Sequence, residues 1–262
     1  MQIDLDHAAA FAATGGRAFD EKLPVVIFLH GAGMDHTVWS LQARYLAHHG
    51  RAVLALDLPG HGKSAGPALR SIPEMADWLA KLLDKMEIAQ AALVGHSMGA
   101  LIALDLAGRM PDRLRALALL GVAERMPVHP DLQQAAERNE ELAAELITSW
   151  SHARRGQVGG HPSPGLWMAG GAVRLIDRAA DGVLAADLAA CNAYDKARER
   201  AASVRCSALF LLGAADRMTP PPKAKPLIDA IAGAHVITLP AAGHMMMTEQ
   251  PDAVTDALRG FV

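Results

Sequence analysis

The 262-residue sequence has few of the residues that mark cross-linked, metal-binding or nucleic-acid-binding proteins. It contains two cysteines, Cys191 and Cys206, which are too few for a disulfide framework and show no metal-ligand spacing. No H-E-x-x-H pattern or comparable cluster occurs among the twelve histidines, so neither a metal nor an organic cofactor is predicted. Lysine and arginine are scattered and the formal net charge is -3. We therefore do not expect a nucleic acid as partner.

The sequence also lacks the patterns of a secretory leader and of a membrane span. Its first six residues, MQIDLD, include acids where a signal peptide needs a basic region followed by an apolar core. Residues 230–248 contain no Asp, Glu, Lys or Arg, but Gly233, Pro240 and Gly243 interrupt them. We therefore expect a cytoplasmic protein without a membrane segment.

The apolar residues that are present predict one globular domain with a sizeable core, because 51% of the sequence is hydrophobic. Short apolar runs alternate with helical stretches, which indicates parallel strands joined by crossover helices. The expected strands are 25–29, 52–56, 91–94, 116–120, 208–212 and 236–239, and the expected helices are about 38–48, 73–86, 97–110, 223–231 and 252–261. The sequence therefore predicts an α/β fold with a mostly parallel central sheet flanked by helices.

The N-terminal segment has the pattern of a hairpin that precedes this alternation. Residues 8–13 and 17–19 are joined by Thr14-Gly15-Gly16. Adjacent glycines accept the positive φ angles of tight turns. We expect these two runs to pair with each other.

Residues 125–203 break the alternation and are rich in Ala, Arg, Glu and Pro. Helical patches are expected at 132–150 and 181–200, and a glycine- and proline-rich loop at 156–171. We predict that residues 125–203 form an inserted helical cap, and that residues 1–124 and 204–262 form the core.

The segment Gly95-His96-Ser97-Met98-Gly99 lies between an apolar run and a helical stretch, which is typical of a nucleophile elbow. A serine at the tip of so sharp a turn needs strained backbone angles. The positions two before and two after it must be nearly free of side chain. Gly95 and Gly99 meet this requirement, so Ser97 is the predicted nucleophile.

Polar residues follow two later strands and complete a triad in the order Ser97, Asp216, His244. Asp216 lies in the loop after 208–212 and His244 in the loop after 236–239. An imidazole can accept the serine proton when a carboxylate holds its other nitrogen. The carboxyl ends of parallel strands meet at one edge of a sheet, where open α/β folds bind their ligands. We therefore predict these three as catalytic residues.

The loop His30-Gly31-Ala32-Gly33 follows the strand at 25–29 and suits an oxyanion hole, because small residues let backbone N–H groups approach a substrate oxygen. The donor in this loop is the N–H of Ala32 or of Gly33, and we favour Ala32. The second predicted donor is the N–H of Met98, at the start of a helix whose dipole favours negative charge.

These motifs together resemble the α/β-hydrolase superfamily, in particular the small serine esterases and the related enol-lactonases with a helical cap. The resemblance covers both flanks of the chain but not residues 125–203. It rests on His30 to Gly33, Asp57-Leu58-Pro59-Gly60-His61-Gly62-Lys63-Ser64, the elbow, Gly213 to Pro220, and Gly243-His244 followed by Glu249-Gln250-Pro251. It implies an α/β-hydrolase fold, a structural role for the 57–64 turn, and Glu124 as an alternative to Asp216 as the acid.

The predicted reaction is hydrolysis of a carboxylic ester or lactone through an acyl-enzyme, with a small molecule as partner and no cofactor. Trp150, Trp167 and Met245 are candidates for an apolar substrate pocket. Hydrolysis of a C–C bond in a ring-cleavage product would use the same triad, and some members of the superfamily bind ligands without catalysis. The natural substrate and the oligomeric state are left open by the sequence.

Overall fold

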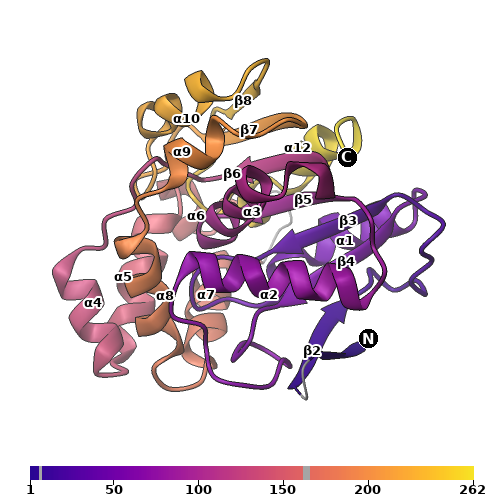
Figure 1. The fold of residues 1–262 in the computed structure, drawn as a ribbon. Helices are drawn as coiled ribbons and strands as arrows, with labels where there is room; N and C mark the ends of the chain where they lie inside the picture. Colours follow the sequence, from indigo (N-terminus) through magenta and orange to yellow (C-terminus); the bar gives the residue numbers. More distant parts are fainter. Residues whose placement is uncertain (6–7, 162–165) are drawn as a thin grey trace.

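The computed structural model describes residues 1–5, 8–161 and 166–262. In this part of the chain the centre of the molecule is an eight-stranded sheet with the order β1-β2-β4-β3-β5-β6-β7-β8 (Figure 1). The strands are β1 (Gln2–Leu5), β2 (Ala8–Ala13), β3 (Val25–Leu29), β4 (Ala52–Asp57), β5 (Ala91–His96), β6 (Leu114–Leu120), β7 (Ser207–Gly213) and β8 (His235–Leu239). From β4 to β8 all neighbouring strands are parallel, whereas β1 and β2 pair in the antiparallel sense. The predicted α/β fold with a mostly parallel sheet is confirmed.

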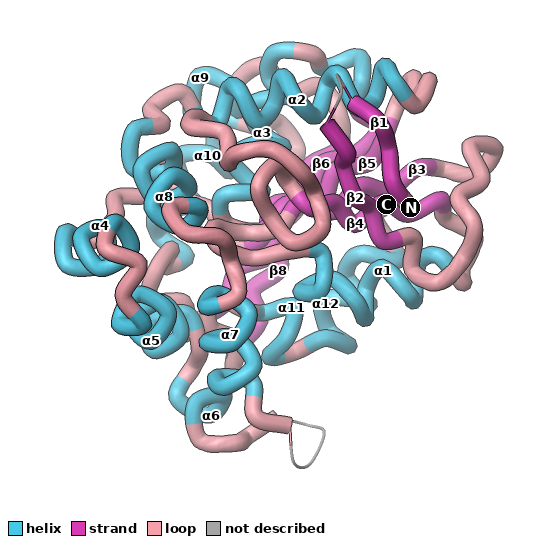
Figure 2. Tube along the Cα trace, turned by 90° about the horizontal axis from the view of Figure 1, so that it is seen from below, coloured by secondary structure: helices cyan, strands magenta, loops and turns pink. Residues whose placement is uncertain are grey.

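Helices cover both faces of the sheet, which explains why the central strands are continuous apolar runs. The flanking helices are α1 (Ser40–Ala47), α2 (Ile72–Lys85), α3 (Met98–Arg109), α10 (Lys225–Ala230), α11 (Met246–Glu249) and α12 (Pro251–Arg259). In β3, Ile27 and Leu29 belong to the apolar cluster that includes α2 and α3. Val26 and Phe28 belong to the cluster with α1 and α12 on the opposite face. Figure 2 shows the two helical layers with the strands between them.

The predicted N-terminal hairpin is wrong in its partners. Residues 17–19 form no strand, and β2 pairs with β1 on one side and with β4 on the other. The turn at Gly15 fits closely against α1, because a Cβ there would lie 2.4 Å from the backbone oxygen of Ala43. The chain leaving β2 is therefore held against α1 and does not return along β2.

Residues 125–203 hold the helices α4 (Pro130–Glu137), α5 (Glu141–Ser151), α6 (Arg154–Gln157), α7 (Met168–Asp177), α8 (Val183–Ala193) and α9 (Ala197–Ala201). An apolar cluster of their own joins α4, α5, α7 and α8. Figures 1 and 2 show α4, α5, α7 and α8 gathered beyond the carboxyl ends of the parallel strands. In contrast, α9 packs against α3 and α10. The division into cap and core stays a prediction.

Three expectations within this region need correction. The helical patch at 181–200 is two helices, α8 and α9, which are separated by residues 194–196. The helical patch at 132–150 is two helices, because the chain turns at Asn139, where φ is 52°. The loop expected at 156–171 ends earlier, since α7 begins at Met168 and includes Gly170 and Gly171. Residues 162–165 of that predicted loop lie outside the described residues.

Over residues 1–5, 8–161 and 166–262, no helix combines sufficient length with sufficient apolar character to cross a bilayer.

Candidate active site

Ser97 lies at the sharp turn between β5 and α3, with φ 53° and ψ -116°. Such angles are strained for a residue with a side chain and persist only when the surrounding structure enforces them. The turn also brings backbones into close contact. A Cβ on Gly95 would lie 2.3 Å from the backbone oxygen of Gly99, and one on Gly99 would lie 2.3 Å from that of Leu29. Both positions therefore require glycine.

His244 and Asp216 follow neighbouring strands, β8 and β7, and their side chains meet. The Nδ1 atom of His244 lies 2.8 Å from Oδ2 of Asp216. Both residues are buried, with 2% and 4% of their surface exposed. Because a carboxylate only accepts, Nδ1 of His244 donates in this pair. In the neutral ring Nε2 is then the acceptor.

Several donors hold Asp216 as a carboxylate. Its Oδ1 accepts the backbone N–H groups of Met218 and Thr219, each at 2.8 Å, and its Oδ2 also accepts the Thr219 hydroxyl at 2.7 Å. Burial disfavours the charge, but the neighbouring His244 and the Thr219 donors outweigh it and hold the pKa of Asp216 well below its usual range. The carboxylate is thus fixed in charge and in orientation.

Ser97 and His244 both line a cavity of about 350 Å³ between α4, α5 and α8 and the carboxyl ends of the strands. Its lining comprises Ala32, Met34, Ser97, Met126, Pro127, Val128, His129, Leu132, Ile147, Trp150, Leu188, Cys191, Arg217, Met218, Thr219 and His244. Within the described residues, Nε2 of His244 is buried without a hydrogen-bond partner, so no bond joins it to the Ser97 hydroxyl. Nucleophile and base are often further apart before substrate binds.

Gly121, which sequence reasoning missed, makes room for the imidazole at the end of β6. Its φ is 57°, and a Cβ there would lie 2.9 Å from Nδ1 of His244. A glycine after an apolar strand is a visible signal. Its partner, 123 positions further along the chain, is not visible in any local pattern.

The loop that carries His244 is held by groups that sequence reasoning did not assign. The backbone N–H of His244 donates to the carbonyl of Ser151, at the end of α5, at 2.6 Å. The buried Glu249 accepts the backbone N–H groups of Gly243 and Ala153, each at 2.9 Å. Glu249 therefore links the residue before the imidazole to the segment after α5. The only sequence signal was the motif in which Glu249 is followed by glutamine and proline.

His96, the second residue of the elbow, contacts the loop that carries His244. Its Nε2 lies 3.0 Å from the carbonyl oxygen of His244, which fixes the proton on Nε2. Burial and the nearby His244 lower the pKa of His96 well below its usual value. His96 is therefore a neutral donor that holds the His244 backbone.

The candidate oxyanion loop lies beside Ser97. Its two candidate donors, the N–H groups of Ala32 and Gly33, have different surroundings. The backbone N–H of Gly33 donates to Oδ2 of Asp187 at 2.8 Å. The N–H of Ala32 has no acceptor among the described residues, and Ala32 lines the cavity. Met98 is the first residue of α3, and its N–H has no intrahelical acceptor. Ala32 and Met98 thus stay the predicted donors.

The three predicted pocket residues divide into one that reaches the cavity and two that do not. Trp150 lines it. Trp167 lies at the start of α7 with 67% of its surface exposed, and Met245 is buried in the apolar cluster on the α12 face of the sheet. Neither is among the residues that line the cavity, so their role in a substrate pocket stays a prediction that this cavity does not support.

Glu124, the alternative acid, lies just beyond β6. Its backbone N–H donates to the carbonyl of Lys223. Over the described ranges, no ion pair joins it to His244, whose Nδ1 faces Asp216. The arrangement therefore favours Asp216 as the partner of the imidazole.

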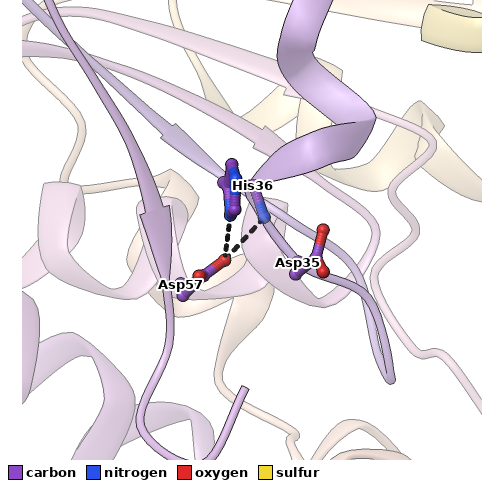
Figure 3. A group of neighbouring side chains, drawn as sticks. All are labelled: Asp35, His36 and Asp57. Carbon is purple, nitrogen blue, oxygen red and sulfur yellow. Dashed lines mark hydrogen bonds and ion pairs between the residues drawn. The ribbon is translucent and has the colours of Figure 1, made fainter. Parts of the chain in front are cut away.

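Asp35, His36 and Asp57 form a group whose ligand atoms could hold a metal ion (Figure 3). The carboxylate oxygens of the two aspartates already accept hydrogen bonds from protein groups. Asp57 accepts the backbone N–H and Nδ1 of His36, and Asp35 accepts donors from Thr37 and Arg178. These bonds tie the turn after β3 to the end of β4. We therefore interpret the group as structural.

Comparison with known proteins identifies the class. The model of the alpha/beta hydrolase family matches residues 26–257. A putative carbamate hydrolase from Klebsiella pneumoniae is 31% identical over 247 residues, covering 90% of both chains. The pimeloyl-[acyl-carrier protein] methyl ester esterase of Chromobacterium violaceum is 31% identical over 245 residues, covering 84% of this chain and 87% of that one. The chain therefore belongs to the α/β-hydrolase family.

A solved structure supports the same assignment. The enol-lactonase from Burkholderia xenovorans LB400 superposes with a TM-score of 0.88 at 25% identity, and the match covers 100% of this chain and 99% of that one. With some other relatives the match is partial: the chain spans 26% of the length of one that is 41% identical over 99 residues.

Proposed function

We propose that this protein is a serine hydrolase that cleaves carboxylic esters, including lactones, through an acyl-enzyme intermediate. The observation that carries the proposal is the bond between Asp216 and Nδ1 of His244, at 2.8 Å, together with the cavity that Ser97 and His244 share. The unpartnered Nε2 of His244 is the group that accepts the serine proton. The relatives that are named as an esterase and an enol-lactonase agree with this chemistry.

In the proposed reaction, the hydroxyl oxygen of Ser97 attacks the ester carbonyl while Nε2 of His244 takes its proton. The imidazolium is stabilised by Asp216 and then protonates the leaving alcohol. Water attacks the resulting acyl-enzyme, gives its proton to Nε2, and the acid leaves as the Ser97 hydroxyl is restored. In a lactone the leaving alcohol stays attached to the acid.

The N–H groups of Ala32 and Met98 are the proposed oxyanion donors. The engagement of the Gly33 N–H by Asp187 favours Ala32 over Gly33. Met98 adds the field of the α3 N-terminus. Removal of one such donor typically costs about 10²–10³-fold in kcat.

The cavity favours a small substrate with an apolar group. Its walls include the apolar side chains of Leu132, Ile147, Trp150 and Leu188, and Arg217 is the lining residue that carries a permanent charge. Such a pocket recognises shape and apolar area. We therefore propose esters of short to medium acyl chains as the substrate class.

Labelling with a fluorophosphonate tests the nucleophile directly. We expect the protein to take up one equivalent of the probe, the Ser97→Ala variant to take up none, and the Ser203→Ala variant, changed at an exposed serine, to react like the parent. An unlabelled parent protein would favour a ligand-binding role without catalysis.

A substrate series then separates the reaction types. The parent protein is assayed with p-nitrophenyl esters of increasing chain length, with lactones, and with vinylogous diketones. We expect turnover of the esters or lactones. Turnover of the diketones alone would assign the protein to C–C bond hydrolysis and contradict the proposal.

A further inference from the structure

A buried polar junction joins α8 to the turns that follow β3 and β4. Asp187, on α8, is fully buried. Its Oδ2 accepts the backbone N–H of Gly33 and lies at the same distance, 2.8 Å, from Nε2 of His61. Its other oxygen, Oδ1, is buried without a partner in the described part of the chain. One oxygen of this carboxylate therefore contacts two separate turns of the core.

The hydrogen bonds of His61 show that its ring carries both protons. Nδ1 lies 3.0 Å from the carbonyl oxygen of Pro59, which can only accept, and Nε2 faces the carboxylate of Asp187. Burial opposes the charge, but the charge of Asp187 and its hydrogen bond outweigh burial and raise the pKa of His61 above its usual value. A buried ion pair thus holds α8 against the core.

His30, beside His61, is the neutral member of the pair of rings. The ring centroids are 4.8 Å apart. Nε2 of His30 accepts the backbone N–H of Leu58 at 3.1 Å, so this nitrogen is unprotonated. Burial, and next the nearby His61, lower the pKa of His30 to about 4. His30 is therefore the neutral ring of the pair, and His61 is the ring that faces the carboxylate of Asp187.

The same junction fixes the loop beside Ser97. Gly33 has a φ of 66°, and a Cβ there would lie 2.8 Å from Cδ1 of Leu184, which is also on α8. Its N–H belongs to the peptide group that it shares with Ala32. When Asp187 holds that peptide, the preceding N–H, that of Ala32, is free to face the cavity.

We propose that Asp187 is a positioning residue that completes the oxyanion hole from α8, by binding the Gly33 N–H and so orienting the Ala32 N–H. The proposal rests on the function proposed above. It makes the docking of α8 a condition for stabilising the oxyanion. Loss of the bond between Asp187 and Gly33 should slow the chemical step and leave the binding of the substrate's apolar group largely intact.

The test compares Asp187→Ala and Asp187→Asn with the control Arg178→Gln. Arg178 directly follows α7 and forms an ion pair with Asp35 in the turn after β3, but no hydrogen bond or ion pair joins it to Gly33 or His61 over the described ranges. We expect Asp187→Ala to lower kcat for a p-nitrophenyl ester by about 10–100-fold, with KM changed less than about threefold. In Asp187→Asn the amide oxygen can still accept from Gly33, so part of kcat should return.

A pair of inhibitors separates orientation of the oxyanion hole from general loosening. A trifluoromethyl ketone forms a tetrahedral adduct with the nucleophile and needs the oxyanion donors, whereas the matching alcohol only fills the pocket. In Asp187→Ala we expect the ketone to bind at least about tenfold more weakly and the alcohol to bind as before. Arg178→Gln should leave the ratio of the two affinities unchanged.

Three results would overturn the proposal: kcat near that of the parent in Asp187→Ala, an equal loss in Arg178→Gln, or no recovery in Asp187→Asn. If Asp187→Ala does not fold, Asp187→Ser, which admits water to the junction, replaces it with the same expectations. Fluorophosphonate labelling of the parent keeps the two proposals distinct. An unlabelled parent contradicts the proposed function, whereas a labelled and active parent with unaffected variants contradicts only the role of Asp187.

Discussion

Asp216 and Glu124 are two carboxylates that follow strands at the same edge of the sheet, and one of them contacts His244. Asp216 lies 2.8 Å from Nδ1 of His244, whereas Glu124 makes a backbone bond to Lys223. We expect Asp216→Asn to lower kcat by about 10⁴-fold, because the amide cannot hold the productive tautomer of the imidazole.

The matched variant Glu124→Gln should keep kcat within about threefold of the parent. Both values come from ester hydrolysis by purified proteins whose circular dichroism is unchanged. The opposite pattern, with Glu124 essential, would move the acid to the end of β6.

Gly121 is a further residue whose identity the site requires. In Gly121→Ala the new Cβ meets Nδ1 of His244, so we expect kcat to fall by at least about tenfold beyond any loss of stability. Gly50→Ala is the control, because Gly50 has a φ of 80° and no atom within 4 Å of the added Cβ. It should cost about 1 kcal/mol of unfolding free energy through backbone strain and leave kcat unchanged.

Urea unfolding and ester kinetics on both glycine variants make the comparison. Equal kinetic losses in the two variants would show that strain alone matters and that the space beside the imidazole does not.

Single residues differ in how far the sequence reveals them. Ser97, Gly95 and Gly99 are identified by a local pattern, the elbow motif, although the atom that excludes a side chain at Gly99 belongs to the distant Leu29. Asp187 and Gly121 act on partners 154 and 123 positions away, and no local pattern records such a contact. The sequence therefore indicates the proposed reacting groups more readily than the groups that we propose to orient them.

At the scale of elements, the loop after β8 depends on a bond network that spans α5, α6 and α11. Glu249 accepts backbone N–H groups from Gly243 and Ala153. In Glu249→Gln one oxygen becomes an NH₂ group that faces one of these donors. We expect a loss of about 1–3 kcal/mol in the free energy of unfolding, because a buried donor is left unsatisfied.

Thermal and urea unfolding measure this loss, and Glu145→Gln, at an exposed glutamate on α5, is the control. A Glu249→Gln protein as stable as the control would mean that the network contributes little to the fold.

Among the elements, the strands are predicted more accurately from the sequence than the segments that connect them. The parallel strands are continuous apolar runs because helices bury both of their faces. α7 packs against α5, and the chain that leaves β2 passes close to α1 at Gly15. Those contacts are non-local, so composition predicted a loop and a hairpin in their place.

At the scale of the whole molecule, the cavity belongs to two parts of the chain. The strand ends contribute Ser97 and His244, and the inserted helices contribute apolar walls such as Ile147 on α5. The chemistry and the substrate preference should therefore respond to different substitutions. A change in the wall should alter which ester is preferred without altering the attack by Ser97.

We expect Ile147→Ala to move the preferred acyl chain of p-nitrophenyl esters towards longer chains, because the smaller side chain enlarges the pocket. The ratio of kcat/KM for the longer ester to kcat/KM for the parent's preferred ester should rise by about 10-fold. This is within the range of discrimination that one methylene group gives in an apolar pocket. Leu142→Ala, on the same helix but 46% exposed, should leave the profile unchanged. A profile that stays fixed in Ile147→Ala would place the acyl chain elsewhere, and the α5 wall would then have no part in choosing the substrate.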